Sequence, residues 1–462
     1  MFVLLEAGRF LYGDILVDLI ASVVYPDGNL RLKAGLERNP NDLTSWFALI
    51  SGMSIAVLLL VTAILFLLAS ALHISLPYEL CDRQKVQFFE FALRISNEYL
   101  GNAVEFIAGA RVRNQLTRFL TGFPYLFQGK HPSWCTIRTE YIGGTKCRVY
   151  LPDNTKRTSN ACIIFIHGGG WCIMRARYYD GPMLSLIRRT GTPIISIDYQ
   201  LSPDKQFPSA IHECENVVKE VYERKYEELQ IDREKIILIG DSAGGNLTAV
   251  ICQRLLRAQC NYVKCQILVY PVIHCLDFLA PSHQYYYRSY NGSALLNPPS
   301  LARWTLMYLG IEATRKNIKL ILKNRHLPKE LSESRDVQKM LDYYTNLPES
   351  FVCKSKYTKP LPTYPDEELA KKMAKFLTDP DFCPILGNNL EGLPPALIMT
   401  AGVDILRDEG VLYSKRLKQF NVPTKWLHYE SAFHGVMNMP GSKQRTQMLN
   451  DIQTHLSSLQ LL

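Results

Sequence analysis

The residues of this sequence best suited to chemistry are a serine and its flanking glycines, at Gly240-Asp241-Ser242-Ala243-Gly244. The run Lys235-Ile-Ile-Leu-Ile239, apolar after its first residue, precedes them and a helical pattern follows. A sharp turn from strand to helix needs flanking residues almost without side chains, and it presents the serine hydroxyl above the helix N-terminus. The spacing alone is modest evidence, because it also arises by chance and a glycine turn can simply close a strand. Its position between strand and helix predicts that Ser242 is a nucleophile.

A second glycine-rich segment follows the apolar run 162–166 and reads His167-Gly168-Gly169-Gly170-Trp171. Three successive glycines leave backbone N–H groups unobstructed, so they can face a developing negative charge on a bound oxygen. A flexible turn is the alternative, although linkers rarely lie between an apolar strand and a tryptophan. We expect Gly168, Gly169, Gly170 and Ala243 to form an oxyanion hole. His167, at the strand end, is expected to support this oxyanion loop (residues 167–172) and not to act as a base.

An acid and a base are expected downstream of the serine. Asp404 comes directly after the apolar run 396–401, where a carboxylate can reach across the end of a sheet, whereas Asp408 fits better as the N-cap of a helix at 409–420. His434 follows the run 424–430 in a loop before Gly435, whereas His428 lies inside that run. The sequence therefore predicts catalysis by Ser242, Asp404 and His434, with His428 as a structural histidine.

The elements that must position these residues alternate between strands and helices. Several of the strand-like runs are rich in Ile and Val with little alternation, which is typical of parallel strands covered on both faces. They lie at 135–142, 146–151, 162–166, 193–198, 236–240, 265–270, 396–401 and 424–430, and helical patterns occupy 207–225, 244–258 and 409–420. This alternation predicts an α/β fold with one mostly parallel eight-stranded sheet and helices on both faces.

Two segments do not follow this alternation. Residues 276–380 form a long insertion, aromatic at first and then basic and Pro-rich, and residues 86–127 carry apolar side chains at helical spacing. Insertions of this length are usually functional or form a subdomain. We expect a cap over the active site from 276–380, joined by a helical segment at 73–132, on a catalytic domain at 133–462.

The N-terminal part contains an uncharged apolar run at 46–72. A helix needs about 20 such residues to cross a bilayer, which favours a transmembrane anchor. A cleavable signal peptide is the alternative, because Ala69-Ser70-Ala71 resembles a cleavage site, but the run is longer than a usual signal-peptide core. Residues 1–45 are an extension without a readable role, and Met53 inside the run leaves open whether residues 1–52 belong to the native protein.

Composition excludes several classes of function. The net charge is +9, but basic and acidic residues are mixed along the chain, so a nucleic-acid partner is not expected. None of the 12 cysteines forms a Cys-x-x-Cys pair, so a zinc site is not expected either. The predicted chemistry requires no metal and no organic cofactor.

These motifs together resemble the hormone-sensitive-lipase group of α/β-hydrolases, and within it the arylacetamide-deacetylase-like proteins. The matching segments are His167 to Cys172, Asp198 to Pro203, Gly240 to Gly245, Asp404 to Asp408 and Phe433 to Gly435. The resemblance implies an α/β-hydrolase fold, a single-pass type II protein of the endoplasmic reticulum membrane and a lumenal catalytic domain.

The sequence departs from the group at two positions. Gln200 replaces the usual arginine, and Ala401 replaces the cysteine that pairs with the equivalent of Cys172, so that disulfide cannot form. Neither departure involves the three catalytic candidates.

The function predicted from these observations is hydrolysis of carboxylic esters or acetamides of lipophilic substrates. The alternatives are a non-catalytic receptor or lipid-binding protein on the same fold, and a membrane protein with a degenerate hydrolase domain. Asn291-Gly-Ser293 is a glycosylation sequon on the expected cap, and it would be used only in a lumenal domain. Neither the natural substrate nor the oligomeric state follows from the sequence.

Overall fold

A computed structural model describes residues 55, 57–70, 73, 75–127, 131–290 and 296–462. By compactness the chain divides into two units. One comprises residues 1–76 and 82–95, and the other comprises residues 77–81 and 96–462. The predicted extension at 1–45 and the sequon residue Asn291 lie outside the described residues.

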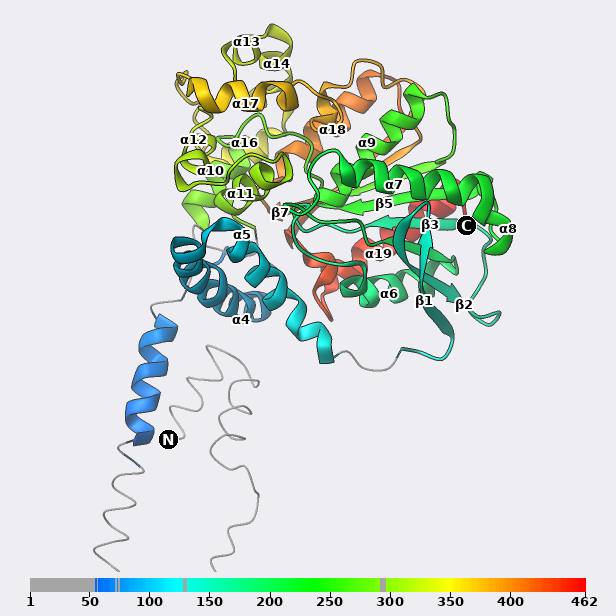
Figure 1. Cartoon of the computed structure of the whole chain (residues 1–462), viewed down its shortest axis with the longest axis horizontal. Coiled ribbons are helices and arrows are strands. Elements are labelled where there is room, and N and C mark those ends of the chain that lie inside the picture. The colour runs from blue at the N-terminus through cyan, green and yellow to red at the C-terminus, as the bar shows by residue number, and fades with distance from the viewer. Residues whose placement is uncertain (1–54, 56, 71–72, 74, 128–130, 291–295) are drawn as a thin grey trace, which may run out of the picture. The chain divides into compact units, whose positions relative to one another are not determined.

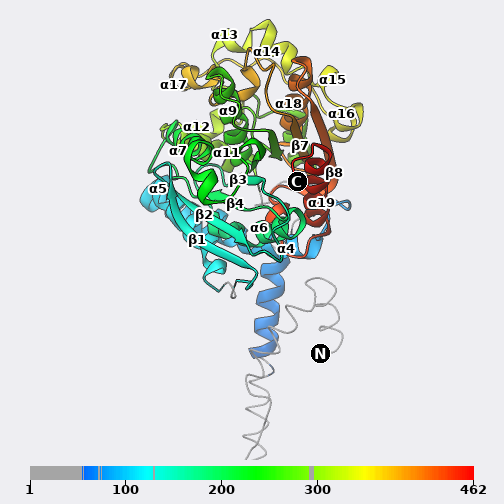
Figure 2. The same cartoon turned by 90° about the vertical axis from the view of Figure 1, so that its right-hand side faces the viewer.

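The larger unit is built on an eight-stranded sheet with the strand order β1-β2-β4-β3-β5-β6-β7-β8. β2 runs antiparallel to both of its neighbours, β1 and β4, and the strands from β4 to β8 are parallel. Figure 2 shows the strands fanning from β1 and β2 on one side to β8 on the other. The strand bounds are β1 Cys135–Ile142, β2 Thr145–Pro152, β3 Cys162–Ile166, β4 Ile194–Ile197, β5 Ile236–Asp241, β6 Cys265–Val269, β7 Ala396–Val403 and β8 Thr424–Phe433.

Every residue of β3, β4, β5, β6 and β7 is buried, because helices cover both faces of the sheet. Figure 1 shows α7 and α9 on one face and α6 and α19 on the other. These apolar runs without alternation are therefore the core of the domain, and the predicted α/β fold is confirmed. The helix bounds are α6 Asp180–Thr190, α7 Ser209–Glu220, α9 Ala243–Arg257, α18 Arg407–Gln419 and α19 Lys443–Ser458.

A helical insertion separates β6 from β7. It occupies much of the expected cap segment and gathers on one side of the sheet (Figure 1). Its helices are α10 Pro281–Ser289, α11 Pro298–Tyr308, α12 Arg315–Ile321, α13 Lys329–Ser332, α14 Arg335–Met340, α15 Tyr343–Asn346, α16 Glu349–Ser355 and α17 Glu367–Leu377.

The segment before the sheet is helical, as the apolar spacing predicts. In the smaller unit α4 spans Arg83–Leu93, and in the larger unit α5 spans Gly101–Gly122, with a break at Gly109. A π-helix at Arg94–Leu100 precedes α5 and a 3-10 helix at Phe123–Phe127 follows it.

Within the described residues, no helix combines the length and hydropathy needed to cross a membrane. The predicted anchor at 46–72 lies partly outside those residues, since 46–54, 56, 71 and 72 are not described.

Candidate active site

Ser242 lies at the turn between β5 and α9, with backbone angles φ 54° and ψ −121°. Its N–H donates to the carbonyl of Val269 on β6 at 2.9 Å, which fixes the turn against the sheet. The flanking glycines are required by space: a Cβ on Gly244 would lie 2.0 Å from the carbonyl oxygen of Ile166. The Gly-x-Ser-x-Gly pattern therefore forms the strained turn that the sequence predicts.

The structure brings Ser242, His434 and Asp404 together from three strand ends. His434 Nε2 lies 2.9 Å from Ser242 Oγ, and His434 Nδ1 lies 2.9 Å from Asp404 Oδ2. Asp404 is buried, and its second oxygen accepts the N–H of Leu406 at 2.9 Å. This is the geometry in which a histidine removes a proton from a serine while a carboxylate fixes its tautomer.

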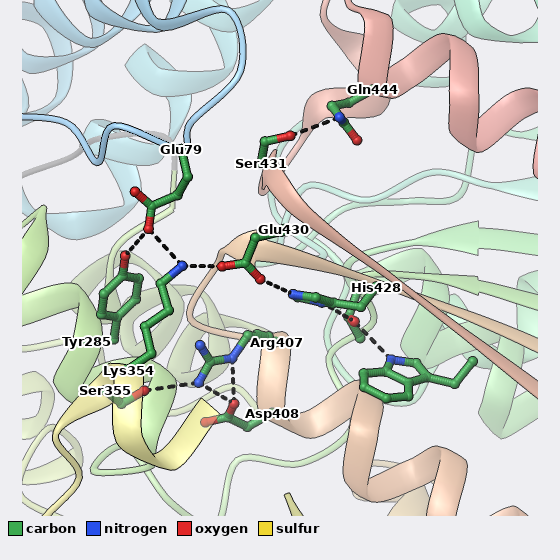
Figure 3. Close-up of polar contacts among 12 residues, drawn as sticks. Glu79, Tyr285, Lys354, Ser355, Arg407, Asp408, His428, Glu430, Ser431 and Gln444 are labelled. Carbon is green, nitrogen blue, oxygen red and sulfur yellow. Dashed lines mark hydrogen bonds and ion pairs between the residues drawn. The ribbon is translucent and has the colours of Figure 1, made fainter. Parts of the chain in front are cut away.

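Asp408 does not cap a helix. Helix α18 begins at Arg407, so Asp408 lies inside its first turn, and the expected N-cap is wrong. Its carboxylate instead pairs with the buried guanidinium of Arg407 at 2.8 Å (Figure 3). It also accepts the N–H of Ser282 at 2.6 Å. Asp408 therefore connects the start of α10 to the start of α18, the helix that follows Asp404.

The oxyanion loop lies against the serine. A Cβ on Gly168 would lie 3.0 Å from Ser242 Cβ. Among the residues that the structure describes, no acceptor receives the N–H of Gly169, Gly170 or Ala243. These three groups are therefore available to a ligand oxygen, as an oxyanion hole requires.

Gly168 differs from its neighbours in the oxyanion loop. Its N–H donates to Asp241 Oδ1 at 2.8 Å and also approaches the hydroxyl of Tyr179 at 3.3 Å. Its inclusion among the oxyanion donors is therefore corrected, because this N–H already has acceptors. Burial raises the pKa of Asp241 to about 6, and no sequence pattern pointed to its contact with the oxyanion loop.

His167 is completely buried beneath the oxyanion loop. Its ring stacks on Tyr199 with centroids 4.3 Å apart, and Nδ1 lies 2.8 Å from the carbonyl of Gly168. Burial lowers its pKa to about 4, so the imidazole is neutral at physiological pH. These contacts fit the predicted role of His167, which is to support the oxyanion loop.

Two side chains of α5 hold the far end of the oxyanion loop. Arg118 Nε donates to the carbonyl of Cys172 at 2.7 Å, and Asn114 Nδ2 approaches the same oxygen at 3.3 Å. Arg118 also donates to the carbonyl of Ser202 and pairs with Asp204, both at 2.6 Å. Sequence reasoning missed both residues, because they lie far from the loop in the chain.

A series of polar contacts connects α16 with β8, the strand that ends before His434 (Figure 3). Lys354 on α16 pairs with Glu79 at 2.7 Å and with Glu430 on β8, and Glu430 in turn contacts His428 Nε2 at 2.9 Å. His428 Nδ1 is 2.9 Å from Thr400 Oγ1 on β7. His428 thus has partners on both ring nitrogens, as expected of a structural histidine.

One buried carboxyl beside the acid was not expected. Glu409 accepts the N–H groups of Ile273 at 2.6 Å and His274 at 2.9 Å. Burial raises its pKa to about 8, and the nearby charges of Asp404 and Asp408 add to that shift. No group of three or more His, Cys, Asp or Glu side chains suited to a metal ion occurs in the described part of the chain.

The fold and this arrangement define a hydrolase with the geometry of a serine enzyme. The family model described as the alpha/beta hydrolase fold matches residues 163–337 and 359–438, and the chain belongs to this family. The resemblance read from the motifs is confirmed.

Two named relatives are similar along most of their length. Arylacetamide deacetylase of Rattus norvegicus is 33% identical, over 68% of this chain and 78% of its own. Neutral cholesterol ester hydrolase 1 of Bos taurus is 28% identical, over 82% of this chain and 92% of its own. The chain is accordingly an enzyme of the carboxylesterase kind.

Solved structures of esterases share the fold. An esterase from Pyrobaculum calidifontis superposes with a TM-score of 0.55 at 23% identity, over 76% of this chain and 94% of its own. A solved arylesterase gives the same TM-score at 22% identity, over 83% of this chain and 99% of its own.

Proposed function

We propose that the chain hydrolyses carboxylic esters or acetamides of lipophilic substrates, with Ser242 as nucleophile, His434 as base and Asp404 as the acid that orients it. The observation that carries this proposal is the pair of 2.9 Å contacts from His434, one to Ser242 Oγ and one to Asp404 Oδ2. The names of the relatives support the substrate class, since one refers to arylacetamides and another to cholesterol esters.

In this mechanism His434 Nε2 takes the proton as Ser242 Oγ attacks the acyl carbonyl, and Asp404 stabilises the imidazolium. The tetrahedral oxyanion accepts hydrogen bonds from the N–H groups of Gly169, Gly170 and Ala243. His434 then protonates the departing alcohol or amine. A water molecule, deprotonated by His434, attacks the acyl-serine, and His434 returns that proton to Ser242 Oγ as the carboxylic acid is released.

The test is Ser242→Ala, assayed on a short-chain aryl ester and with a fluorophosphonate probe. Without the nucleophile, kcat should fall by about 10⁴-fold or more, and labelling should be lost. Labelling of the native chain at Ser242 distinguishes an enzyme from a non-catalytic binding protein, because only an activated hydroxyl reacts. Activity that survives the substitution would exclude this mechanism.

We also propose that the protein is a single-pass type II protein of the endoplasmic reticulum membrane, with a lumenal catalytic domain. The uncharged run at 46–72 and the sequon at Asn291 support this location. A glycosidase-sensitive mass shift that disappears in Asn291→Gln is the expected result. A native chain without any such shift in cells that glycosylate a control protein would contradict a glycosylated lumenal domain.

A further inference from the structure

Helix α5 has its polar and apolar sides reversed with respect to the domain. Apart from Gly101, its buried residues are polar: Arg113, Asn114 and Thr117. Several of its large apolar side chains are exposed instead, with Phe106 at 81%, Ile107 at 82% and Phe119 at 63% relative exposure. A helix on the surface of a water-soluble domain normally has the opposite arrangement.

The inward polar side chains have specific partners. Arg113 pairs with Glu105, and Arg303 on α11 pairs with the same carboxylate at 3.1 Å. Arg118 and Asn114 donate to the oxyanion loop, as described above. These contacts fix the rotation of α5, so its apolar side faces outward as a consequence of the fold.

The charge of the outward face is also distinctive. Glu105 is the only acidic residue between 101 and 127, and it is buried. The exposed Arg111 lies beside the break at Gly109. Arg111 pairs with Asp204 at 3.0 Å, so the charges beside the apolar side chains are paired. An apolar face whose own helix exposes no acidic side chain suits the interface of a phospholipid bilayer.

A groove continues this surface. It has a volume of about 780 Å³ and runs between the broken part of α5 and the segment that joins α11 to α12. Phe106, Ala108, Met307 and Ile311 line it, and Glu105 and Glu312 also contribute. Its apolar lining residues suit contact with an acyl chain that leaves the bilayer surface.

We propose that the outward face of α5, formed by Phe106, Ile107, Val112 and Phe119, inserts into the interface of a phospholipid bilayer. The catalytic domain then rests on the membrane and takes lipophilic substrate from it. This second step rests on the proposed hydrolysis, whereas the insertion itself does not.

Site-specific photo-crosslinking tests the insertion. The full chain carries p-benzoylphenylalanine at Phe106, or at Tyr364 as a control, and is reconstituted in phosphatidylcholine vesicles. Tyr364 lies between α16 and α17 and is 87% exposed, so it matches Phe106 in type and accessibility. Irradiation should add the mass of phosphatidylcholine at 106 and not at 364. Equal lipid adducts at both positions, a crosslinked dimer or a crosslink within the chain would each overturn the proposal.

Kinetics on two substrates test the use of the surface. Since burying each of these side chains contributes about tenfold to partition into an apolar phase, Phe106→Ser with Ile107→Ser should lower hydrolysis of a vesicle-embedded ester by about tenfold or more. Hydrolysis of a water-soluble aryl ester should stay within about twofold, because these side chains do not contact Ser242. The matched control is Leu361→Ser with Tyr364→Ser, at 85% and 87% exposure, which should change neither rate.

The outcomes are distinguishable. An equal loss on both substrates would mean that α5 acts only through the fold, and would overturn membrane docking. Should the native chain cleave neither ester, the proposed hydrolysis fails, while the lipid adduct at 106 still decides the insertion.

Discussion

Replacing Gly170 with alanine tests the oxyanion loop at the point where the insertion covers it. Gly170 has φ of +57°, and a Cβ there would lie 2.4 Å from Cε3 of Trp304 on α11. A left-handed backbone costs a residue with a side chain about 1–2 kcal/mol. The clash adds to this cost, because the nearby atoms belong to a rigid ring and not to the end of a flexible chain. The loop must therefore move, and the Gly170 N–H moves with it.

The expected effect follows from the loss of one donor to the oxyanion. Such a loss lowers kcat by about 10²–10³, or about 2.7–4 kcal/mol of transition-state stabilisation. The assay is kcat and KM on a short-chain aryl ester, together with the melting temperature. Gly144→Ala is the matched control, since Gly144 has φ of +78° and no atom within 4 Å of its Cβ position. Gly144→Ala should lower the melting temperature only by what the left-handed backbone costs an alanine, and it should leave kcat unchanged.

A second variant identifies the cause. If the Trp304 ring displaces the loop, Gly170→Ala combined with Trp304→Ala should recover about tenfold of the lost rate, by a coupling typical of residues in contact. The reasoning is refuted if Gly170→Ala keeps kcat within about threefold of the native value, because then no donor was displaced.

Three further predictions concern groups near the active site. Asp404→Asn should lower kcat by about 10⁴ and leave the melting temperature near the native one. Asp408→Asn should instead lose about 3–5 kcal/mol of stability, because it leaves the charge of the buried Arg407 guanidinium unpaired. Similar kinetics for the two variants would contradict the assignment of Asp404 as the acid. Arg118→Met should lower kcat/KM by about tenfold, because it frees the oxyanion loop. Arg111 also contacts a carboxylate but does not contact the loop, so Arg111→Met should leave kcat/KM unchanged. Equal effects of the two variants would mean that the contact of Arg118 with the loop has no role in catalysis. Burial raises the pKa of Glu409 from its ordinary 4.5 to about 8, so the stability it contributes is complete at low pH and is lost as pH rises through about 8. The melting temperature of Glu409→Gln should therefore rise relative to that of the native chain between about pH 5 and about pH 9, and parallel curves would count against a neutral buried carboxyl.

The sequence predicted the parts of the site that depend on local pattern. β-branched runs marked the buried strands, and the glycines around Ser242 marked a turn that tolerates no side chain. Asp404 and His434 could be chosen over their neighbours because each directly follows a strand, and in a parallel sheet those ends meet at one edge.

The contacts that the sequence did not predict are made between distant segments. The engagement of the Gly168 N–H by Asp241 depends on how β3 and β5 lie side by side, which no local pattern encodes. Asp408 was misassigned because α18 begins two residues earlier than its apolar pattern indicated. The apolar spacing at 86–127 correctly predicted helices, but periodicity does not tell which side of a helix faces the domain.

The position of the insertion in the chain has a consequence for how such enzymes diversify. The insertion leaves after β6 and returns at β7, and these strands are neighbours in the sheet, with Gln266 paired to Ala396. Exchanging the whole segment for that of a homologue therefore leaves the hydrogen-bond ladder of the sheet in place. A transplanted segment must still pack against the glycine at 170 without displacing it, as Trp304 does here. Chimaeras that keep this contact, and also the backbone N–H groups that donate to Asp408 and Glu409, should acquire the substrate range of the donor while keeping the chemistry of the recipient.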